Sequence, residues 1–310
     1  MGEPVESRTN AAPKQNQNHR ASPEVVLQAK GLSKNFKVKV RRGWRSVQQD
    51  VKAVNNVEFT LHRGETLGLV GESGCGKSTL AKLLVRLIEP TSGTIELMGQ
   101  NILELDREAL RQARRKIQMI FQDPYSSLNP RMTVGEIIGE SWEVFPDIVP
   151  VAKRSERIKE LLQQVGLNTS DADRYPHQFS GGQRQRIGIA RALAVEPEVI
   201  ICDEPVSALD VSVQAQVINL LMDIQQDTGV SYVFIAHDLS IVRQISSHVM
   251  VMYLGEIVEG GPVDDVYAKP QHPYTTALLS SIPIQDPAQK QRQVLKLPGE
   301  VPSPMNPPAG

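Results

Sequence analysis

Short, continuously apolar runs alternate with helical stretches along the chain from residue 66 onward. Runs of roughly four to eight apolar residues between helices are typical of strands buried on both faces, as in a largely parallel sheet. A helix is expected to begin at Lys77, shortly after the first run. The pattern therefore predicts an α/β fold. The expected strands are residues 66–70, 117–121, 199–203, 231–236 and 248–252.

Two further strand-like segments, residues 25–29 and 57–61, precede this alternating part. A basic stretch from Lys37 to Arg45 separates them. Charge runs usually face water, so we interpret this stretch as a solvated hairpin or loop rather than a surface for lipid. Residues 1–22 are rich in Asn, Gln, Pro and Ser, which predicts a disordered leader.

A long span without strand character lies between Phe121 and Val199. It contains an amphipathic stretch, residues 152–166, in which Gly166 is a helix stop signal. We interpret the span as a helical subdomain, at approximately residues 123–190, inserted into the α/β core.

The composition of the 310 residues, 40% hydrophobic and 22% charged, is that of a chain able to bury a sizeable core. With 34 basic and 35 acidic residues, no overall charge would attract nucleic acid or an anionic membrane. No apolar run has the length of a membrane-spanning helix, so we expect a cytosolic chain. Two cysteines, Cys75 and Cys202, are too few for a disulfide framework or a cysteine-ligated cluster.

Residues 71–79, GESGCGKST, match the phosphate-binding pattern G-x-x-x-x-G-K-[ST] between an expected strand and an expected helix. The glycines let backbone N–H groups converge on phosphate oxygens, and the helix start adds partial positive charge. Lys77 is expected to meet the β and γ phosphates of a nucleotide, and Ser78 to offer its hydroxyl to Mg²⁺. The expected nucleotide contacts in this phosphate cradle are Gly71, Glu72, Ser73, Gly74, Cys75, Gly76, Lys77, Ser78 and Thr79.

The cradle alone leaves kinases, GTPases, helicases and transporters open. It also places Cys75 near Lys77 and a helix start, where a thiolate is favoured, so we expect a thiol pKa below the ordinary value.

A second apolar strand ends in two acids, Asp203 and Glu204, before Pro205. Consecutive strand residues point to opposite faces, so the two carboxylates have different roles. Asp203 is expected to be the outer-sphere Mg²⁺ partner, and Glu204 to orient and deprotonate the attacking water. Capping of the following helix is the alternative, which the neighbouring cradle makes the weaker one.

Residues 179–187, FSGGQRQRI, resemble the signature sequence of ABC ATPases, with Phe179 where leucine is more usual. Ser180 is a candidate helix N-cap, and Gly181 and Gly182 allow close backbone approach. The helix start offers N–H groups to an anion, and the cradle already provides one phosphate site. A nucleotide shared between two subunits is therefore expected at Ser180, Gly181, Gly182 and Gln183.

The resemblance to ABC ATPases covers roughly residues 25–267 and implies a P-loop core with an N-terminal antiparallel β part and an inserted helical subdomain. It implies that Gln122 senses Mg²⁺ and the attacking water, that His237 contacts the γ-phosphate, and that Phe36 stacks on adenine. Ser78, Gln122 and Asp203 would then surround Mg²⁺. It further implies a loop that couples two active sites, formed by Ser207, Ala208, Leu209 and Asp210.

Four segments and the tail 297–308 look like the dipeptide and oligopeptide importer ATPases, nearest to the dipeptide branch. The segments are residues 121–136, 174–187, 203–216 and 272–283. We therefore expect an ABC ATPase domain at 23–268 and a family extension at 269–310. Members of the family commonly continue into a cysteine-containing tail, whereas this chain ends at Gly310, so no iron–sulfur cluster is expected.

The family implies a motor subunit at the cytoplasmic face of the inner membrane, held there by two transmembrane permease subunits. It also implies a second, related ATPase, or a second copy of this chain, and an extracytoplasmic peptide-binding protein. Relatives that move nickel, glutathione or sugars share much of the pattern. A non-transport ABC ATPase is the rival class, but such proteins carry long coiled coils or zinc modules that this sequence lacks.

Overall fold

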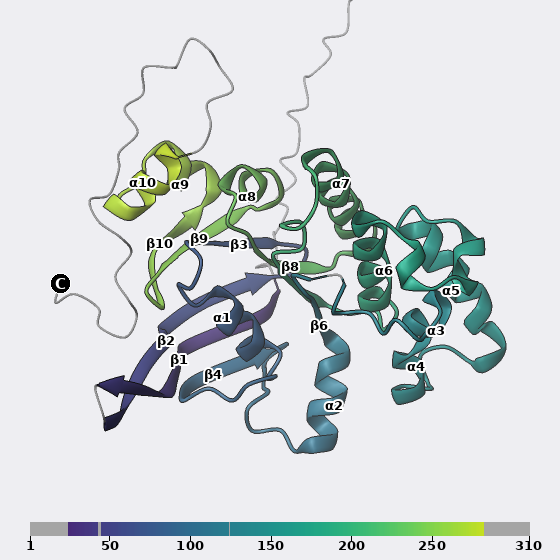
Figure 1. Ribbon diagram of the computed structural model, residues 1–310, viewed down its shortest axis with the longest axis horizontal. Coiled ribbons are helices and arrows are strands. Elements are labelled where there is room, and N and C mark those ends of the chain that lie inside the picture. Colours follow the sequence, from purple (N-terminus) through teal and green to yellow (C-terminus); the bar gives the residue numbers. More distant parts are fainter. Residues whose placement is uncertain (1–23, 43–44, 124, 282–310) are drawn as a thin grey trace, which may run out of the picture.

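The computed structural model describes residues 24–42, 45–123 and 125–281. The expected leader, residues 1–22, and the tail from residue 282 lie outside this part. A six-stranded sheet and a four-stranded sheet organise the described chain, with helices around and beside them (Figure 1).

The six-stranded sheet has the order β10-β9-β3-β8-β7-β6. Five strands run parallel, and β10 (Glu256–Pro262) pairs antiparallel with β9 at one edge. Every residue of β3, β7 and β8 is buried, which explains their continuous apolarity. The predicted parallel strands are therefore confirmed. They are β3 (Thr66–Val70), β6 (Ile117–Ile120), β7 (Val199–Asp203), β8 (Ser231–Ile235) and β9 (His248–Tyr253).

The four-stranded sheet is antiparallel, with the order β2-β1-β4-β5. Its strands are β1 (Val25–Arg42), β2 (Arg45–His62), β4 (Ser92–Leu97) and β5 (Gln100–Asn101). Helix α1 (Lys77–Leu84) buries Leu80, Leu83 and Leu84 in a core that it shares with strands of both sheets. The cradle that precedes α1 is therefore held between the two sheets.

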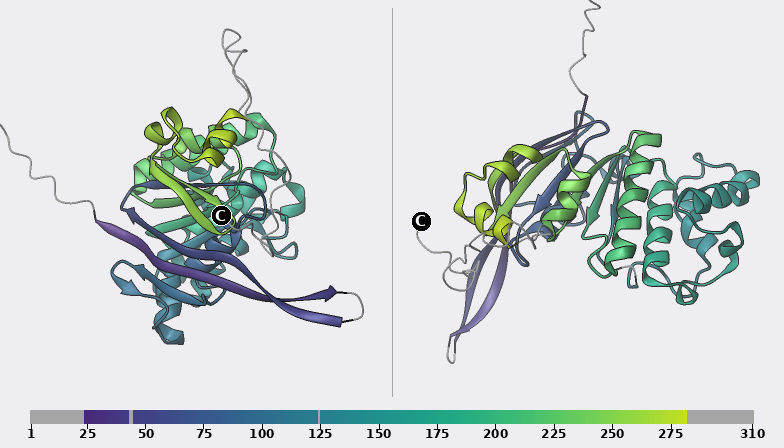
Figure 2. Two further views of the ribbon diagram at one scale, coloured as in Figure 1. Left: turned by 90° about the vertical axis from the view of Figure 1, so that its left-hand side faces the viewer. Right: turned by 90° about the horizontal axis from the view of Figure 1, so that it is seen from above.

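The basic stretch between the first two predicted strands is a hairpin rather than a loop, because β1 and β2 each extend over 18 residues. Lys37 lies opposite Asp50 and Lys39 opposite Gln48 in the pairing of the two strands. Both lysines are exposed. Figure 2 shows the hairpin extending beyond the body of the molecule. The outer part of the hairpin was not predicted as strand because residues 36–39 are all exposed, so the alternation of apolar and polar positions that signals a strand is missing there.

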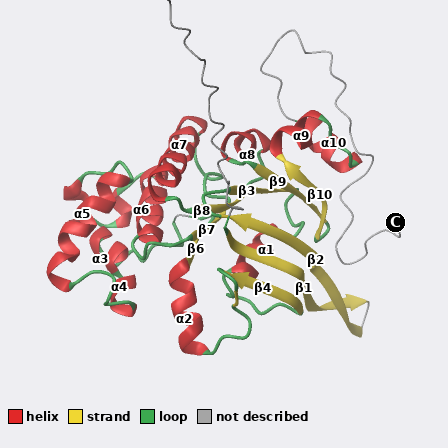
Figure 3. Cartoon of the chain, turned by 180° about the vertical axis from the view of Figure 1, so that it is seen from behind, coloured by secondary structure: helices red, strands yellow, loops and turns green. Residues whose placement is uncertain are grey.

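Helices fill the chain between β6 and β7, and the described residues of this span contain no strand. They are α3 (Val134–Gly139), α4 (Ser141–Val144), α5 (Arg154–Gln164) and α6 (Gly181–Leu193), with short 3₁₀ turns at Val151–Lys153, Thr169–Asp173 and Pro176–Gln178. They lie on the side of the molecule away from β1, β2 and β4 (Figure 3). Buried Trp142, on α4, connects this helix to the end of α6 by donating its indole N–H to the Ala194 carbonyl oxygen at 2.8 Å. The boundaries of the helical subdomain, approximately residues 123–190, stay a prediction.

The remaining helices surround the six-stranded sheet or follow it. They are α2 (Arg107–Lys116), α7 (Val211–Thr228), α8 (Leu239–Ile245), α9 (Val263–Ala268) and α10 (Pro273–Ser280). Figure 1 shows α9 and α10 beside β9 and β10. In the part of the chain that the structure describes, no helix combines the length and apolarity needed to cross a bilayer.

Candidate functional site

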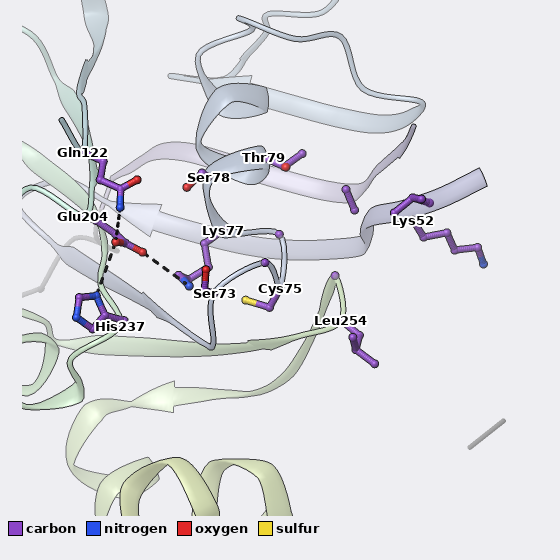
Figure 4. A pocket seen from close by; sticks show the side chains of 15 residues that line it. Lys52, Ser73, Cys75, Lys77, Ser78, Thr79, Gln122, Glu204, His237 and Leu254 are labelled. Carbon is purple, nitrogen blue, oxygen red and sulfur yellow. Dashed lines mark hydrogen bonds and ion pairs between the residues drawn. The ribbon is translucent and has the colours of Figure 1, made fainter. Parts of the chain in front are cut away.

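A cavity of about 290 Å³ opens beside the loop that joins β3 to α1. Ligands of α/β proteins bind at the carboxyl ends of parallel strands, and the loops that follow β3, β6, β7 and β8 all reach this cavity. Figure 4 shows side chains from these loops converging on the space. The lining residues are Val51, Lys52, Ala53, Ser73, Gly74, Cys75, Gly76, Lys77, Ser78, Thr79, Gln122, Glu204, His237, Leu254 and Gly255.

Two glycines of the phosphate cradle stand where no side chain fits. A Cβ at Gly71 would lie 2.2 Å from the Met252 carbonyl oxygen, and one at Gly76 would lie 2.2 Å from the Ala53 carbonyl oxygen. Gly76 also has φ of +116°, a conformation that side chains disfavour. The cradle therefore packs against β9 and β2 by direct backbone contact, and α1 begins at its end.

Lys77 is 4% exposed and lies at the floor of the cavity. Its ammonium donates to the carbonyl oxygens of Gly71 at 2.7 Å and Glu72 at 2.9 Å. It also lies 3.9 Å from a carboxylate oxygen of Glu204. The Lys77 ammonium thus donates to carbonyl oxygens of its own loop. A phosphate group is a charged acceptor and would replace these carbonyls as the partner of Lys77.

Half-buried Ser78 and buried Asp203 form a pair beside the cradle. The Ser78 hydroxyl donates to Asp203 Oδ1 at 3.0 Å, and Asp203 is 4% exposed. Burial raises the pKa of Asp203, while the Ser78 hydrogen bond lowers it. Hydroxyl and carboxylate oxygens suit Mg²⁺, which keeps waters and substrate phosphates as its other ligands. Among the described residues, no three His, Cys, Asp or Glu side chains gather in a way that could hold a metal ion.

Glu204, Gln122 and His237 meet in the cavity from three different loops. The Gln122 amide donates to Glu204 Oε2 at 2.9 Å, and His237 Nδ1 lies 3.7 Å from the same oxygen (Figure 4). Glu204 has φ of +48°, which is unusual for a residue with a side chain and typical of functional sites. The structure thus brings together the three residues that we predicted to be catalytic, around one carboxylate.

The expectation that Cys75 has a lowered pKa is wrong. Cys75 is 6% exposed, and burial raises the pKa of its thiol although the Lys77 charge acts in the opposite direction. Desolvation of the buried thiol outweighs the nearby positive charge of Lys77. Burial also raises the pKa of Cys202, which is fully buried in β7.

Cys75 should therefore react slowly with thiol reagents at neutral pH, because little of it is thiolate. In a Cys202→Ser variant, maleimide labelling of the folded protein is expected to be at least about tenfold slower than labelling of the same protein in denaturant. The rate should rise steadily between pH 7 and pH 9. Labelling of the folded protein as fast as in denaturant would contradict the buried thiol.

Phe36 lies on β1 and is 37% exposed, with the Lys34 ammonium 5.2 Å from its ring centroid. It pairs with Val51 across the strands, and Val51 lines the cavity while Phe36 does not. Stacking of Phe36 on adenine stays a prediction. Sequence reasoning missed Val51, Lys52, Ala53, Leu254 and Gly255, which form this end of the cavity and carry no motif.

Ser180 caps helix α6, as predicted. Its hydroxyl accepts the Gln183 N–H at 3.4 Å, and the Gln183 side chain accepts the Ser180 N–H at 3.0 Å. A Cβ at Gly182 would lie 2.3 Å from a methyl group of Val213, so this glycine lets α6 approach α7. Among the described residues, the cavity wall includes none of positions 180–183. Within one chain, the α6 start and the cradle are separate surfaces.

The loop from Ser207 to Asp210 connects these two surfaces. The Ser207 hydroxyl donates to the Glu204 carbonyl oxygen at 3.1 Å, and Asp210 precedes α7 at the N-cap position. A Cβ on Gly181 would lie 3.4 Å from Leu209. The loop therefore lies against both the backbone of Glu204 and the start of α6, and its role in coupling two sites stays a prediction.

Comparison with known families gives two matches. The family described as ABC transporter matches residues 54–207. The family described as the C-terminal region of oligopeptide/dipeptide transporters matches residues 258–310. The first includes the cradle, Gln122, the acids and residues 180–183, and the second includes α9 and α10.

Curated relatives resemble the chain over nearly its whole length. The oligopeptide transport ATP-binding protein OppF of Escherichia coli is 51% identical over 93% of this chain and 86% of its own length. The dipeptide transport ATP-binding protein DppF of Escherichia coli is 52% identical over 93% of this chain and 85% of its own length. The oligopeptide transport ATP-binding protein AppF of Bacillus subtilis is 53% identical over 94% and 88%.

Solved structures share the fold at lower identity. An ATP-binding cassette solved as a dimer with bound ADP and phosphate has a TM-score of 0.66 and 28% identity, over 76% of this chain and 98% of its own. A part of the cbiONQ ABC transporter complex from Clostridium perfringens has a TM-score of 0.66 and 26% identity, over 79% of this chain and 92% of its own.

Proposed function

Because this chain belongs to the ABC transporter ATP-binding proteins of the oligopeptide and dipeptide type, we propose that it is the ATP-hydrolysing motor of a peptide importer. ATP hydrolysis is the activity of this family. The observation that carries the proposal is the convergence of Lys77, Gln122, Glu204 and His237 on one cavity beside the Ser78–Asp203 pair.

ATP binds with its phosphates in the cradle, where backbone N–H groups and the α1 start receive the negative charge. Lys77 exchanges the carbonyls of Gly71 and Glu72 for the β and γ phosphates. Ser78 and Asp203, which are hydrogen-bonded to each other, would hold Mg²⁺, and the ion would supply positive charge to the phosphates.

Glu204 takes the proton of the attacking water, and its carboxylate is aimed by the Gln122 amide. His237 lies on the other side of the same oxygen and contacts the γ-phosphate. Proton transfer needs an acceptor that is ionised and held in place. Glu204 meets the second condition through Gln122 and through the hydrogen bond from its own N–H to the Ile235 carbonyl, at 3.0 Å.

The start of α6 completes the site of a second ATPase subunit. This is supported by the preference of anions for helix N-termini and by the position of residues 180–183 outside the chain's own cavity. The mate is a second, related ATPase or another copy of this chain. Two transmembrane permease subunits hold the pair at the cytoplasmic face of the membrane, and an extracytoplasmic binding protein delivers the peptide.

Uptake by the reconstituted transporter tests this function. The chain, its co-purified permease and ATPase mate, and the binding protein are placed in vesicles, and entry of labelled dipeptides and tetrapeptides is followed. Peptide uptake is expected to require Mg-ATP and to be lost in a Lys77→Ala variant, because the phosphate contacts are lost. Uptake of nickel, glutathione or a sugar without uptake of peptides would contradict the proposed substrate while leaving the motor function in place.

A further inference from the structure

Helix α10, near the end of the described chain, reaches the phosphate cradle. The Glu72 N–H donates to the hydroxyl of Tyr274 at 2.9 Å, across 202 positions of sequence. Tyr274 is 3% exposed, and its ring lies 4.4 Å from that of Tyr253, centroid to centroid. The segment matched by the C-terminal family therefore provides one hydrogen bond to the loop that binds phosphate.

The position of Tyr274 is fixed by a network at the start of α10. His272 Nδ1 accepts the Tyr274 N–H at 3.2 Å and caps the helix. The two carboxylate oxygens of Glu259, on β10, accept the N–H groups of Gln271 at 2.8 Å and His272 at 3.0 Å. Pro273 occupies the first turn of α10, where its fixed φ suits a helix. The tyrosine is thus held by β10 on one side and β9 on the other.

Both backbone polar groups of Glu72 are hydrogen-bonded. Its carbonyl oxygen accepts the Lys77 ammonium at 2.9 Å and the Cys75 N–H at 3.3 Å, and its N–H is bound by Tyr274. The first two partners belong to the cradle, and Lys77 leaves when it turns to phosphate. Of these three contacts, the Tyr274 hydroxyl is the one that reaches the cradle from outside and does not depend on the nucleotide.

We propose that Tyr274 is a positioning residue that holds the entrance of the phosphate cradle in its binding conformation through the Glu72 amide. The inference rests on the proposed function and extends it, because it gives the C-terminal segment a direct part in nucleotide affinity. A loop held in its bound geometry loses less conformational entropy when the ligand binds. The hydroxyl should therefore matter for ATP binding more than for the chemical step.

The ring and the hydroxyl of Tyr274 have separable roles. The ring packs in the core with Tyr253, which phenylalanine would also do, while the hydroxyl alone reaches Glu72. Burial raises the pKa of Tyr274, so the group is a neutral phenol at neutral pH. Tyr253→Phe is the matched control, since it makes the same change in the other ring of the pair. The Tyr253 hydroxyl has no hydrogen bond to any of the described residues.

The test measures ATP binding and turnover for wild type, Tyr274→Phe and Tyr253→Phe in the assembled transporter. Tyr274→Phe is expected to raise the Kd and KM for ATP by about three- to tenfold, the range for one hydrogen bond. Its kcat at saturating ATP should stay within about twofold of wild type. Tyr253→Phe should leave Kd and KM unchanged. Binding is measured well below the unfolding midpoint of each variant, so that a change in stability does not enter the Kd.

Equal ATP affinity in wild type and Tyr274→Phe would overturn the positioning role, and so would a loss confined to kcat. An equal rise of Kd in both phenylalanine variants would assign the effect to ring packing and also overturn it. Failure of the wild type itself to bind ATP would instead refute the proposed function. The two failures are therefore distinguished by the wild-type titration.

Discussion

Replacing Glu204 by glutamine is expected to lower ATP turnover by at least about a hundredfold while ATP binding is retained. The change keeps the size of the side chain and removes only the ability to accept a proton. The amide oxygen of the new residue can still accept the hydrogen bond that Gln122 now donates to Glu204 at 2.9 Å. The geometry around the cavity should therefore survive, and the effect should fall on kcat.

The measurement compares the Kd for ATP with single-turnover hydrolysis in wild type and Glu204→Gln. The variant should hold ATP with wild-type affinity, and the subunit pair should stay closed on it. Glu58→Gln removes one exposed carboxylate of β2 outside the cavity and should change neither quantity. Near-normal turnover in Glu204→Gln would rule out Glu204 as the base.

Replacing Ser180 by arginine is expected to lower hydrolysis at the partner's cradle by about a hundredfold, the scale on which one oriented donor to a reacting oxyanion matters. Arginine fills the space before the α6 start and removes the cap that Gln183 and Ser180 form together. Nucleotide binding at this chain's own cradle should survive, because none of residues 180–183 lines its cavity among the described residues.

Thr133→Arg provides the matched control for loss of a cap. Thr133 and Glu136 form the same reciprocal hydrogen bonds at the start of α3. Its loss should reduce stability by about 1 kcal/mol, as for Ser180, and leave both nucleotide sites working. If the two variants lose hydrolysis equally, the effect of Ser180→Arg comes from helix capping and the α6 start does not serve a nucleotide.

The apolar strands could be predicted from the sequence because β3, β7 and β8 are buried at every position and are apolar except for one end residue in each. The cradle was predictable because two of its glycines stand where a side chain would clash. Gly71 lies against the Met252 carbonyl oxygen and Gly76 against the Ala53 carbonyl oxygen. The N-cap at Ser180 follows from local hydrogen bonding, which residue type alone indicates well.

The features that sequence could not predict depend on contacts between distant parts of the chain. The raised pKa of Cys75 comes from burial under neighbouring elements, which a motif does not reveal. The positive φ of Glu204 places its carboxylate toward Gln122 and departs from the alternation expected at the end of a strand. The bond from Glu72 to Tyr274 joins the cradle to a segment 202 residues away, so no local pattern signals it.

A mixture of two inactive chains tests most directly the central claim that ATP is hydrolysed between two subunits. One chain carries Lys77→Ala and the other Ser180→Arg, each with its own tag. Where the natural mate is a different ATPase, the equivalent lesions are placed one in each subunit of the transporter. In the mixed pair, one interface collects both lesions and the other keeps an intact Lys77 and an intact Ser180.

The account predicts that ATP turnover returns in the mixture although each variant alone is inactive, and that a photoreactive ATP analogue labels the Ser180→Arg chain. A mixture that stays inactive, with the label absent from the Ser180→Arg chain, would place Ser180 at its own chain's nucleotide and contradict the shared site.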